Sequence, residues 1–165
     1  MTASASSAPT SVPTATRGLA AQALTLDDIE RRIQDRFPEL TTELARGELT
    51  VHATETTLVD LLTFCRDDAE LSFEMLADLS GVHWPAGEHV IERQLSTTGW
   101  PQYRVDRDQG VIEVLYILRS VTRNHVLRVA IGVDDTEPVV PTATGVYPTA
   151  NFHEREVYDF FGVEF

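Results

Sequence analysis

The chain has 165 residues, and its 26 acidic and 13 basic side chains give a formal net charge of −13. This excess of acidic over basic residues argues against binding to nucleic acid or to anionic lipid, because both need a basic protein surface. No apolar run reaches the roughly 18 residues that a membrane-spanning helix needs. Cys65 is the one cysteine, which excludes an internal disulfide and leaves a Cys-based zinc site or an iron–sulfur cluster without enough ligands from this chain.

The first 24 residues differ in composition from the rest. They are mostly Ala, Ser, Thr and Pro with a single Arg, and they lack the hydrophobic core of a secretory signal. Such a segment cannot bury enough apolar surface to fold, so we predict a disordered, low-complexity tail over 1–24. Residues 25–165 are expected to form a single domain.

The first half of this domain predicts two helices and a strand. Apolar residues recur at helical spacing over 26–37, with Thr25 and Asp28 as a capping pair and Pro38 beyond the end. Alternation over 48–53 predicts a short strand with one buried face. A second helix is expected to run to residue 66 with Thr56 as its N-cap, and Cys65 within it is interpreted as a buried structural thiol.

The second half is richer in strand signals. The pattern over 73–82 is ambiguous, and we expect a strand in its second half that stops at Gly81. Clear alternation over 112–119 and again over 127–133, around a polar turn at 122–124, predicts an antiparallel hairpin at the centre of the sheet. Trp84-Pro85 and Trp100-Pro101 are interpreted as loop anchors whose indole rings serve packing.

The last predicted helix follows a loop rich in Pro and Thr (138–144), with Pro148 as its first residue and Gly162 as its stop. The order of elements therefore indicates an α+β fold, with helices packed on a mostly antiparallel or mixed sheet. One side of this helix carries Ala150, Glu154, Val157 and Phe161, and another carries Phe152, Glu156 and Phe160. Arg155 and Asp159 lie four residues apart and can pair along the helix.

The charges on this helix do not have the spacing of a known catalytic or metal site. A zinc-protease motif needs a second His where Val157 stands, and Glu154 and Glu156 point in different directions because they are two residues apart. The five His residues are scattered without a second ligand at metal-binding spacing, and no phosphate-binding glycine motif is present. Two interpretations remain from the residues alone: a terminal helix docked on its own domain, or one that serves an interface.

The segment Glu154 to Val163 closely resembles the signature of the thirty-kilodalton subunit family of respiratory complex I, known in bacteria as the C subunit of NADH:quinone oxidoreductase. The resemblance extends upstream through residues 148–152 and the strand residues 127–129. It continues to residues 73–82. The next residue, His83, stands where the family has an acidic residue. Residues 58–165 are covered, most strongly at the end.

This resemblance implies a non-catalytic structural subunit in the peripheral arm of a proton-translocating NADH:quinone oxidoreductase. Such a subunit holds no catalytic residue, metal or cofactor itself, and flavin, iron–sulfur clusters and quinone belong to its partners. It packs on the subunit homologous to the hydrogenase large subunit, which helps to form the quinone pocket, at the cytoplasmic face of the bacterial membrane. The residues implied to contact that partner are Glu154, Arg155, Glu156, Tyr158, Asp159, Phe160, Phe161 and Gly162.

Other functions remain open from the sequence. The nearest is the equivalent subunit of a membrane-bound hydrogenase or of a ferredoxin- or F420-dependent dehydrogenase. A free-standing enzyme with His153, Glu154 and Glu156 as acid/base groups would need a convergent geometry, and a soluble adaptor is a third alternative. Family members usually continue into a Gly-His-Pro-containing segment and a tail. Without that tail, binding is expected to rest on the folded domain alone.

Overall fold

The computed structural model describes residues 24–91 and 103–165. The predicted tail over 1–24 therefore lies outside the described residues except for Leu24, and so does Trp100-Pro101. The described chain forms three helices and two sheets, which confirms the α+β class. The helices are α1 (Leu26–Arg36), α2 (Leu58–Asp67) and α3 (Ala150–Phe161).

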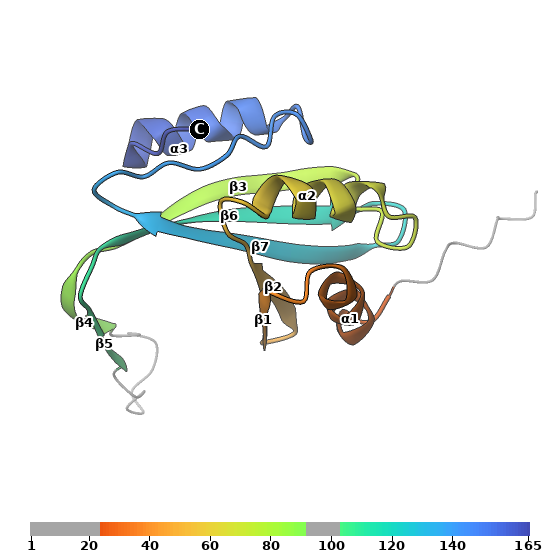
Figure 1. The fold of residues 1–165 in the computed structure, drawn as a ribbon, viewed down its shortest axis with the longest axis horizontal. Helices are drawn as coiled ribbons and strands as arrows, with labels where there is room; N and C mark the ends of the chain where they lie inside the picture. Colours follow the sequence, from red (N-terminus) through yellow and green to blue (C-terminus); the bar gives the residue numbers. More distant parts are fainter. Residues whose placement is uncertain (1–23, 92–102) are drawn as a thin grey trace, which may run out of the picture.

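The main sheet is mixed and has the strand order β1-β2-β7-β6-β3. Its strands are β1 (Thr41–Ala45), β2 (Glu48–His52), β3 (Met75–Trp84), β6 (Val111–Ser120) and β7 (His125–Asp134). The pairing of β2 with β7 is parallel, and the other pairings are antiparallel. The predicted hairpin is β6–β7, and its interior position in the sheet is confirmed. A two-stranded ribbon of β4 (Gly87–Ile91) and β5 (Tyr103–Arg107) projects from the end of this sheet (Figure 1).

The core lies between the sheet and the helices on one of its faces. Every second residue of β6 is buried, beginning with Ile112 and Val114, as expected for a strand with one covered face. Figure 1 shows α3 running alongside β3, α2 crossing the view of β3 and β6, and α1 beside β2. Gly81 of β3 pairs with Val114 and faces the ring of Phe161 in α3. Helix α3 therefore covers the buried face of the sheet at β3.

The first helix follows the sequence prediction closely. Thr25 is the N-cap of α1, and its hydroxyl oxygen accepts a hydrogen bond from the Asp28 amide at 3.2 Å. Ile29 and Ile33, four residues apart, are fully buried. The helix stops before Pro38, because a residue that precedes proline is forced out of the helical conformation.

Strand β1 and the β4–β5 ribbon were not predicted. All residues of β1 except Thr42 are exposed, so the strand has no alternation of buried and exposed residues that a sequence pattern could show. The available signal was the turn Arg46-Gly47, in which both residues have positive φ, as a two-residue hairpin turn of this kind requires. This turn pairs Ala45 with Glu48 and closes the β1–β2 hairpin.

The start of α2 was misplaced by one residue. The N-cap is Thr57 and not Thr56, and the Thr57 side chain makes no capping hydrogen bond to the helix. Its hydroxyl oxygen instead accepts from the Thr54 amide at 2.9 Å, which fixes the turn before the helix. Cys65 is fully buried, and this burial raises the pKa of its thiol, in agreement with a structural role.

The predicted end of β3 at Gly81 is wrong, because the strand continues to Trp84. A shift in register at Ala77 places Leu76 and Leu79, three residues apart, on the buried face. This bulge explains the ambiguous alternation, since an extra residue reverses the faces of a strand. Trp84 is the last residue of this strand, so its predicted place in a loop is wrong, and the Arg107 guanidinium lies over its half-buried ring, 4.7 Å from the centroid.

Candidate functional site: the C-terminal helix

Helix α3 begins later than the sequence predicted and ends where it predicted. Thr149 is the N-cap and Ala150 the first helical residue, so the predicted start at Pro148 is wrong by two residues. The amides of Ala150, Asn151 and Phe152 bond three residues back, to Tyr147, Pro148 and Thr149, which forms a tighter turn ahead of the helix. Gly162 has φ of +72° and its amide donates to the Tyr158 carbonyl at 2.8 Å, which confirms the left-handed stop.

The side of α3 that carries Ala150, Glu154, Val157 and Phe161 faces the core. Ala150, Glu154 and Val157 are buried, and Phe161 is partly buried against the core cluster. A Cβ atom at Gly81 would lie 2.7 Å from Cδ2 of Phe161, closer than carbon atoms can approach. The absence of a side chain at Gly81 thus makes the space that Phe161 fills, and helix and strand are fitted to each other.

Glu154 is a buried carboxylate with partners inside the domain. The residue is 6% exposed, and its two carboxylate oxygens accept hydrogen bonds from the Ala143 amide at 2.7 Å and the Thr142 hydroxyl at 2.8 Å. Burial and, to a smaller extent, the charge of Glu154 raise the pKa of Tyr116 on β6. The structure therefore places this signature residue where it fixes the loop before α3, and not on the surface.

The opposite side of α3 is open. Phe152 and Phe160 are each 74% exposed, and Glu156 between them is exposed as well. These three residues, four apart along the helix, form a row that we call the outer stripe. Phe152 was not among the residues predicted to contact a partner, although its spacing from Glu156 and Phe160 was visible in the sequence.

The remaining predicted residues flank the outer stripe. Tyr158 is 55% exposed, and Arg155, Asp159 and Gly162 are also on the surface. Among the ion pairs of the described residues none joins Arg155 to Asp159, although the spacing allows one. Both line an open hollow of about 350 Å³, whose other residues are Asn151, Glu154, Tyr158, Val163 and Phe165.

The end of the chain is held against the loop that precedes α3. The Val140 amide donates to the Glu164 carbonyl, and the Glu164 amide donates to the Pro138 carbonyl, both at 2.8 Å. These bonds and those of Glu154 attach the same loop, 138–147, to both ends of the signature segment. These hydrogen bonds therefore hold α3 in a fixed position relative to the loop.

The three candidate acid/base groups do not meet in one site. His153 lies with Nδ1 4.0 Å from Oδ1 of Asp78, Glu154 points into the domain, and Glu156 points outward. Within the residues that the structure describes, no group of three His, Cys, Asp or Glu side chains is placed to hold a metal ion. The described helices also include none that is both long and apolar enough to cross a membrane.

Comparison with known proteins identifies the family. Residues 51–165 match the family described as the respiratory-chain NADH dehydrogenase 30 kDa subunit. The chain belongs to this family. It is 38% identical over 120 residues to the NADH-quinone oxidoreductase C subunit of Nocardia farcinica, covering 73% of this chain and 40% of that protein. It is also 38% identical over 124 residues to the corresponding protein of Streptomyces coelicolor, covering 75% of this chain and 41% of that protein.

Solved structures share the fold of this chain. A trypsin-resistant fragment (1-134) of Nqo5 superposes with a TM-score of 0.60 and 25% identity, covering 86% of this chain and 96% of the fragment. A chain of the archaeal membrane-bound sulfane sulfur reductase has a TM-score of 0.54 at 22% identity, covering 84% of this chain and 69% of that chain, which shows a shared fold. The match to the two curated relatives above spans less than half of their length.

Proposed function

We propose that this chain is a non-catalytic structural subunit in the peripheral arm of a proton-translocating NADH:quinone oxidoreductase, at the cytoplasmic face of the bacterial membrane. It docks on the subunit that is homologous to the hydrogenase large subunit and forms part of the quinone pocket. Flavin, iron–sulfur clusters and quinone are assigned to the partner subunits, and none to this chain. The observation that carries the proposal is the outer stripe, two exposed phenylalanines and a glutamate on the helix that holds the family's signature segment.

The energetics of the outer stripe favour a buried state in an assembly. Transfer of a phenylalanine side chain from water into an interface contributes about 1.5–3 kcal/mol, and Phe152 and Phe160 are both largely in water in the isolated domain. Large aromatic side chains are enriched in the cores of interfaces. The neighbouring charges of Glu156, Arg155 and Asp159 would fix the orientation of the partner, because wrong pairings of like charges cost free energy.

The inner face supplies rigidity rather than contact area. Glu154 is satisfied by Thr142 and Ala143, and Phe161 fills the space over Gly81. These contacts hold α3 in one position, so the outer stripe is presented without a further loss of conformational freedom on binding. Glu154 and Phe161 therefore act in docking by positioning the helix, whereas Phe152, Glu156 and Phe160 make the contact.

The test is co-expression of the tagged chain with the redox subunits encoded beside it, followed by affinity purification and mass spectrometry. Phe152→Ala combined with Phe160→Ala is expected to reduce recovery of the partner at least tenfold, because two interface anchors are lost. Val121→Ala is the control, since Val121 is 67% exposed in the β6–β7 turn. Equal recovery with both variants would rule out docking through α3.

The identity of the recovered subunits tests the rest of the proposal. Flavin- and NADH-binding subunits are expected together with the hydrogenase-large-subunit homologue. Recovery of a large subunit with a nickel site, without NADH-binding subunits, would instead assign the chain to a hydrogenase-type complex. Recovery of the chain alone under conditions that preserve the complex would contradict both.

A further inference from the structure

Strand β3 is an edge strand whose outer side has no strand beside it in the described part of the chain. It is ten residues long and pairs on its other side with β6 through nearly its whole length. In an antiparallel edge strand, alternate backbone N–H and C=O groups point away from the sheet and remain available for pairing with another chain. The β3 edge therefore offers a ready template for one additional strand.

A groove accompanies this edge on the side of α3. It has a volume of about 140 Å³ and lies between residues 78–81 of β3 and α3, where Glu156, Val157, Phe160 and Phe161 line it. Leu79 and Val157 at its base are buried. The exposed ring of Phe160 lines this groove and also belongs to the outer stripe. The strand edge and the outer stripe thus form one continuous surface.

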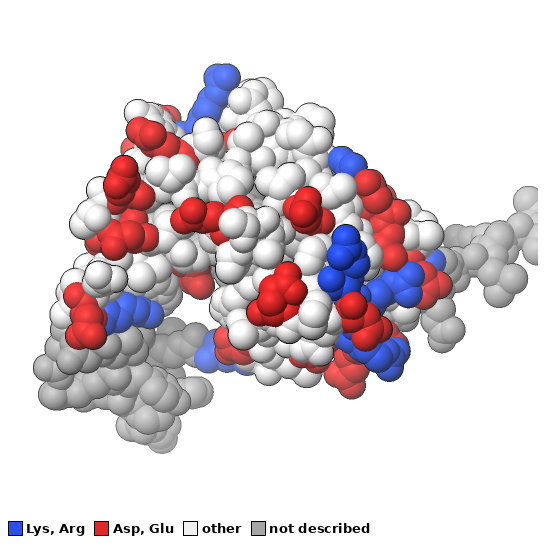
Figure 2. All heavy atoms as spheres, in the orientation of Figure 1, with Lys and Arg blue, Asp and Glu red and all other residues white. Residues whose placement is uncertain are grey.

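The rim of the groove is acidic. Asp78, on β3, has a side chain that is 54% exposed, and the exposed Glu156 of α3 lines the same groove. His153 lies 4.0 Å from Asp78 and is the nearest basic group in the described structure to that carboxylate. On the face seen in Figure 2, Asp and Glu side chains spread over the α3 end of the molecule, while most visible Arg side chains gather towards α1.

We propose that an extended segment of the partner protein adds to the main sheet as a sixth strand beside β3. The segment places an apolar side chain in the groove between Leu79 and Phe160, and an Arg or Lys next to Asp78 and Glu156. Addition of a strand to a sheet edge, with a side-chain pocket for specificity, is a recurring mode of peptide recognition. This assignment rests on the function proposed above and names how the partner is bound.

Charge decides between a partner segment and a second copy of this chain. A twofold pairing of two β3 strands would bring two copies of the rim formed by Asp78 and Glu156 together, on molecules that each carry a formal net charge of −13. Like charges placed opposite each other across paired strands are destabilising. A basic segment of a different protein would instead be attracted to the negative charges of Asp78 and Glu156. The groove therefore fits a segment of another protein better than a second copy of this chain.

Hydrogen exchange of the purified complex, compared with the isolated chain, tests the added strand directly. The outward-pointing amides within 75–84 are expected to become at least tenfold slower to exchange on assembly, because they gain hydrogen-bond partners. Strand β1 at the opposite edge of the same sheet is the internal control, and its amides in 41–45 are expected to change less than twofold. A complex in which 75–84 exchange as in the free chain would overturn the added strand alone.

A charge reversal provides the second measurement. Asp78→Arg is expected to weaken partner binding at least tenfold, while Glu43→Arg on β1, where the side chain is 66% exposed, changes it less than twofold. Glu156→Arg tests the helix side of the groove should Asp78→Arg fail to fold. Equal binding by the groove variants and the control would overturn the proposal. Failure of the unaltered chain to enter any complex would instead overturn the proposed function, and this inference with it.

Discussion

Glu154 illustrates how one buried carboxylate is stabilised without a basic partner. A buried charge is costly unless hydrogen bonds replace its hydration, and here an amide and a hydroxyl supply them. Both donors come from the loop before α3, so the side chain links two segments that are adjacent in space and separated by 11 and 12 residues in the chain. Glu154, which the family resemblance implied to contact the partner, is thus part of the domain's own framework.

The first prediction concerns this residue. Glu154→Ala is expected to lower the free energy of unfolding by about 2–3 kcal/mol, because the buried Ala143 amide loses its acceptor and a small cavity is left. Chemical denaturation measures the loss. Thr142→Val is the control for the second hydrogen bond and is expected to cost about 1 kcal/mol. An unchanged midpoint for Glu154→Ala would mean that Glu154 does not hold the loop.

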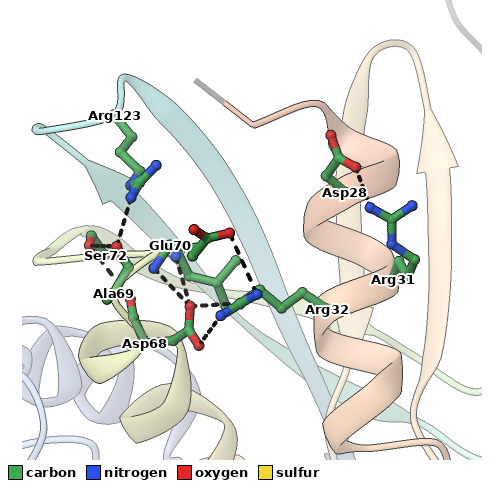
Figure 3. A network of polar contacts seen from close by, with 9 residues as sticks. Asp28, Arg31, Arg32, Asp68, Ala69, Glu70, Ser72 and Arg123 are labelled. Carbon is green, nitrogen blue, oxygen red and sulfur yellow. Dashed lines mark hydrogen bonds and ion pairs between the residues drawn. The ribbon is translucent and has the colours of Figure 1, made fainter. Parts of the chain in front are cut away.

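At the scale of elements, Asp68 joins α1 to the segment that follows α2. Its carboxylate accepts hydrogen bonds from Arg32 at 2.8 and 2.9 Å and from the amides of Glu70 and Leu71 at 3.0 Å (Figure 3). Burial raises the pKa of Asp68, but the bonds from Arg32 and the two amides outweigh it, so the pKa is lowered overall. Asp68 is therefore more acidic in the folded chain than in the unfolded one.

The second prediction is the pH dependence that this shift produces. A carboxylate with a depressed pKa contributes stability above its unfolded value, near 3.8, and that stability is lost as the pH falls through the folded value. Asp68→Asn is expected to lower the free energy of unfolding by about 1 kcal/mol at pH 7, and by less at pH 3. Urea titrations at both pH values measure the difference. An equal loss at both would exclude Asp68 as a titrating contributor.

The sequence predicted elements well where a local signal and a buried face coincide. Helix α1 has a cap and two buried isoleucines at helical spacing, and the β6–β7 hairpin alternates over its whole length. Strand β1 is nearly all exposed, and β3 contains a bulge, so neither shows an uninterrupted alternation of period two. These elements form because a neighbouring strand pairs with them, and such a neighbour is not visible in a local pattern.

The candidate site shows a different limit. Spacing correctly separated the two sides of α3, but each side has a glutamate and a phenylalanine, Glu154 with Phe161 and Glu156 with Phe160. Periodicity alone cannot say which pair turns inward. Distant residues decide it: the Ala143 amide receives Glu154, and Gly81 leaves room for Phe161. The resemblance to the family located the segment, and tertiary contacts divided it into a framework side and an exposed side.

At the scale of the whole molecule, the formal net charge of −13 favours a basic partner and affects the rate constant of association with it. Electrostatic attraction between a charged protein and a partner of opposite sign raises the association rate constant at low salt. Salt screens this long-range attraction within about 10 Å at 0.1 M. Dissociation depends on contacts in the formed interface and responds less to salt. An acidic docking surface thus predicts a specific pattern in the two rate constants.

The third prediction separates the charge of the docking surface from the charge of the molecule. Two double variants each raise the net charge from −13 to −11, because each removes two acids: Glu156→Gln with Asp159→Asn on α3, and Glu43→Gln on β1 with Glu55→Gln in the turn before α2. With the co-purified partner immobilised, the α3 variant is expected to associate roughly 3–10 times more slowly at low salt and to show a weaker salt dependence. The control is expected to stay within about twofold of the unaltered chain, because Glu43 and Glu55 are on neither α3 nor the β3 groove. If both variants slow association equally, net charge alone steers the encounter and α3 has no special part in it.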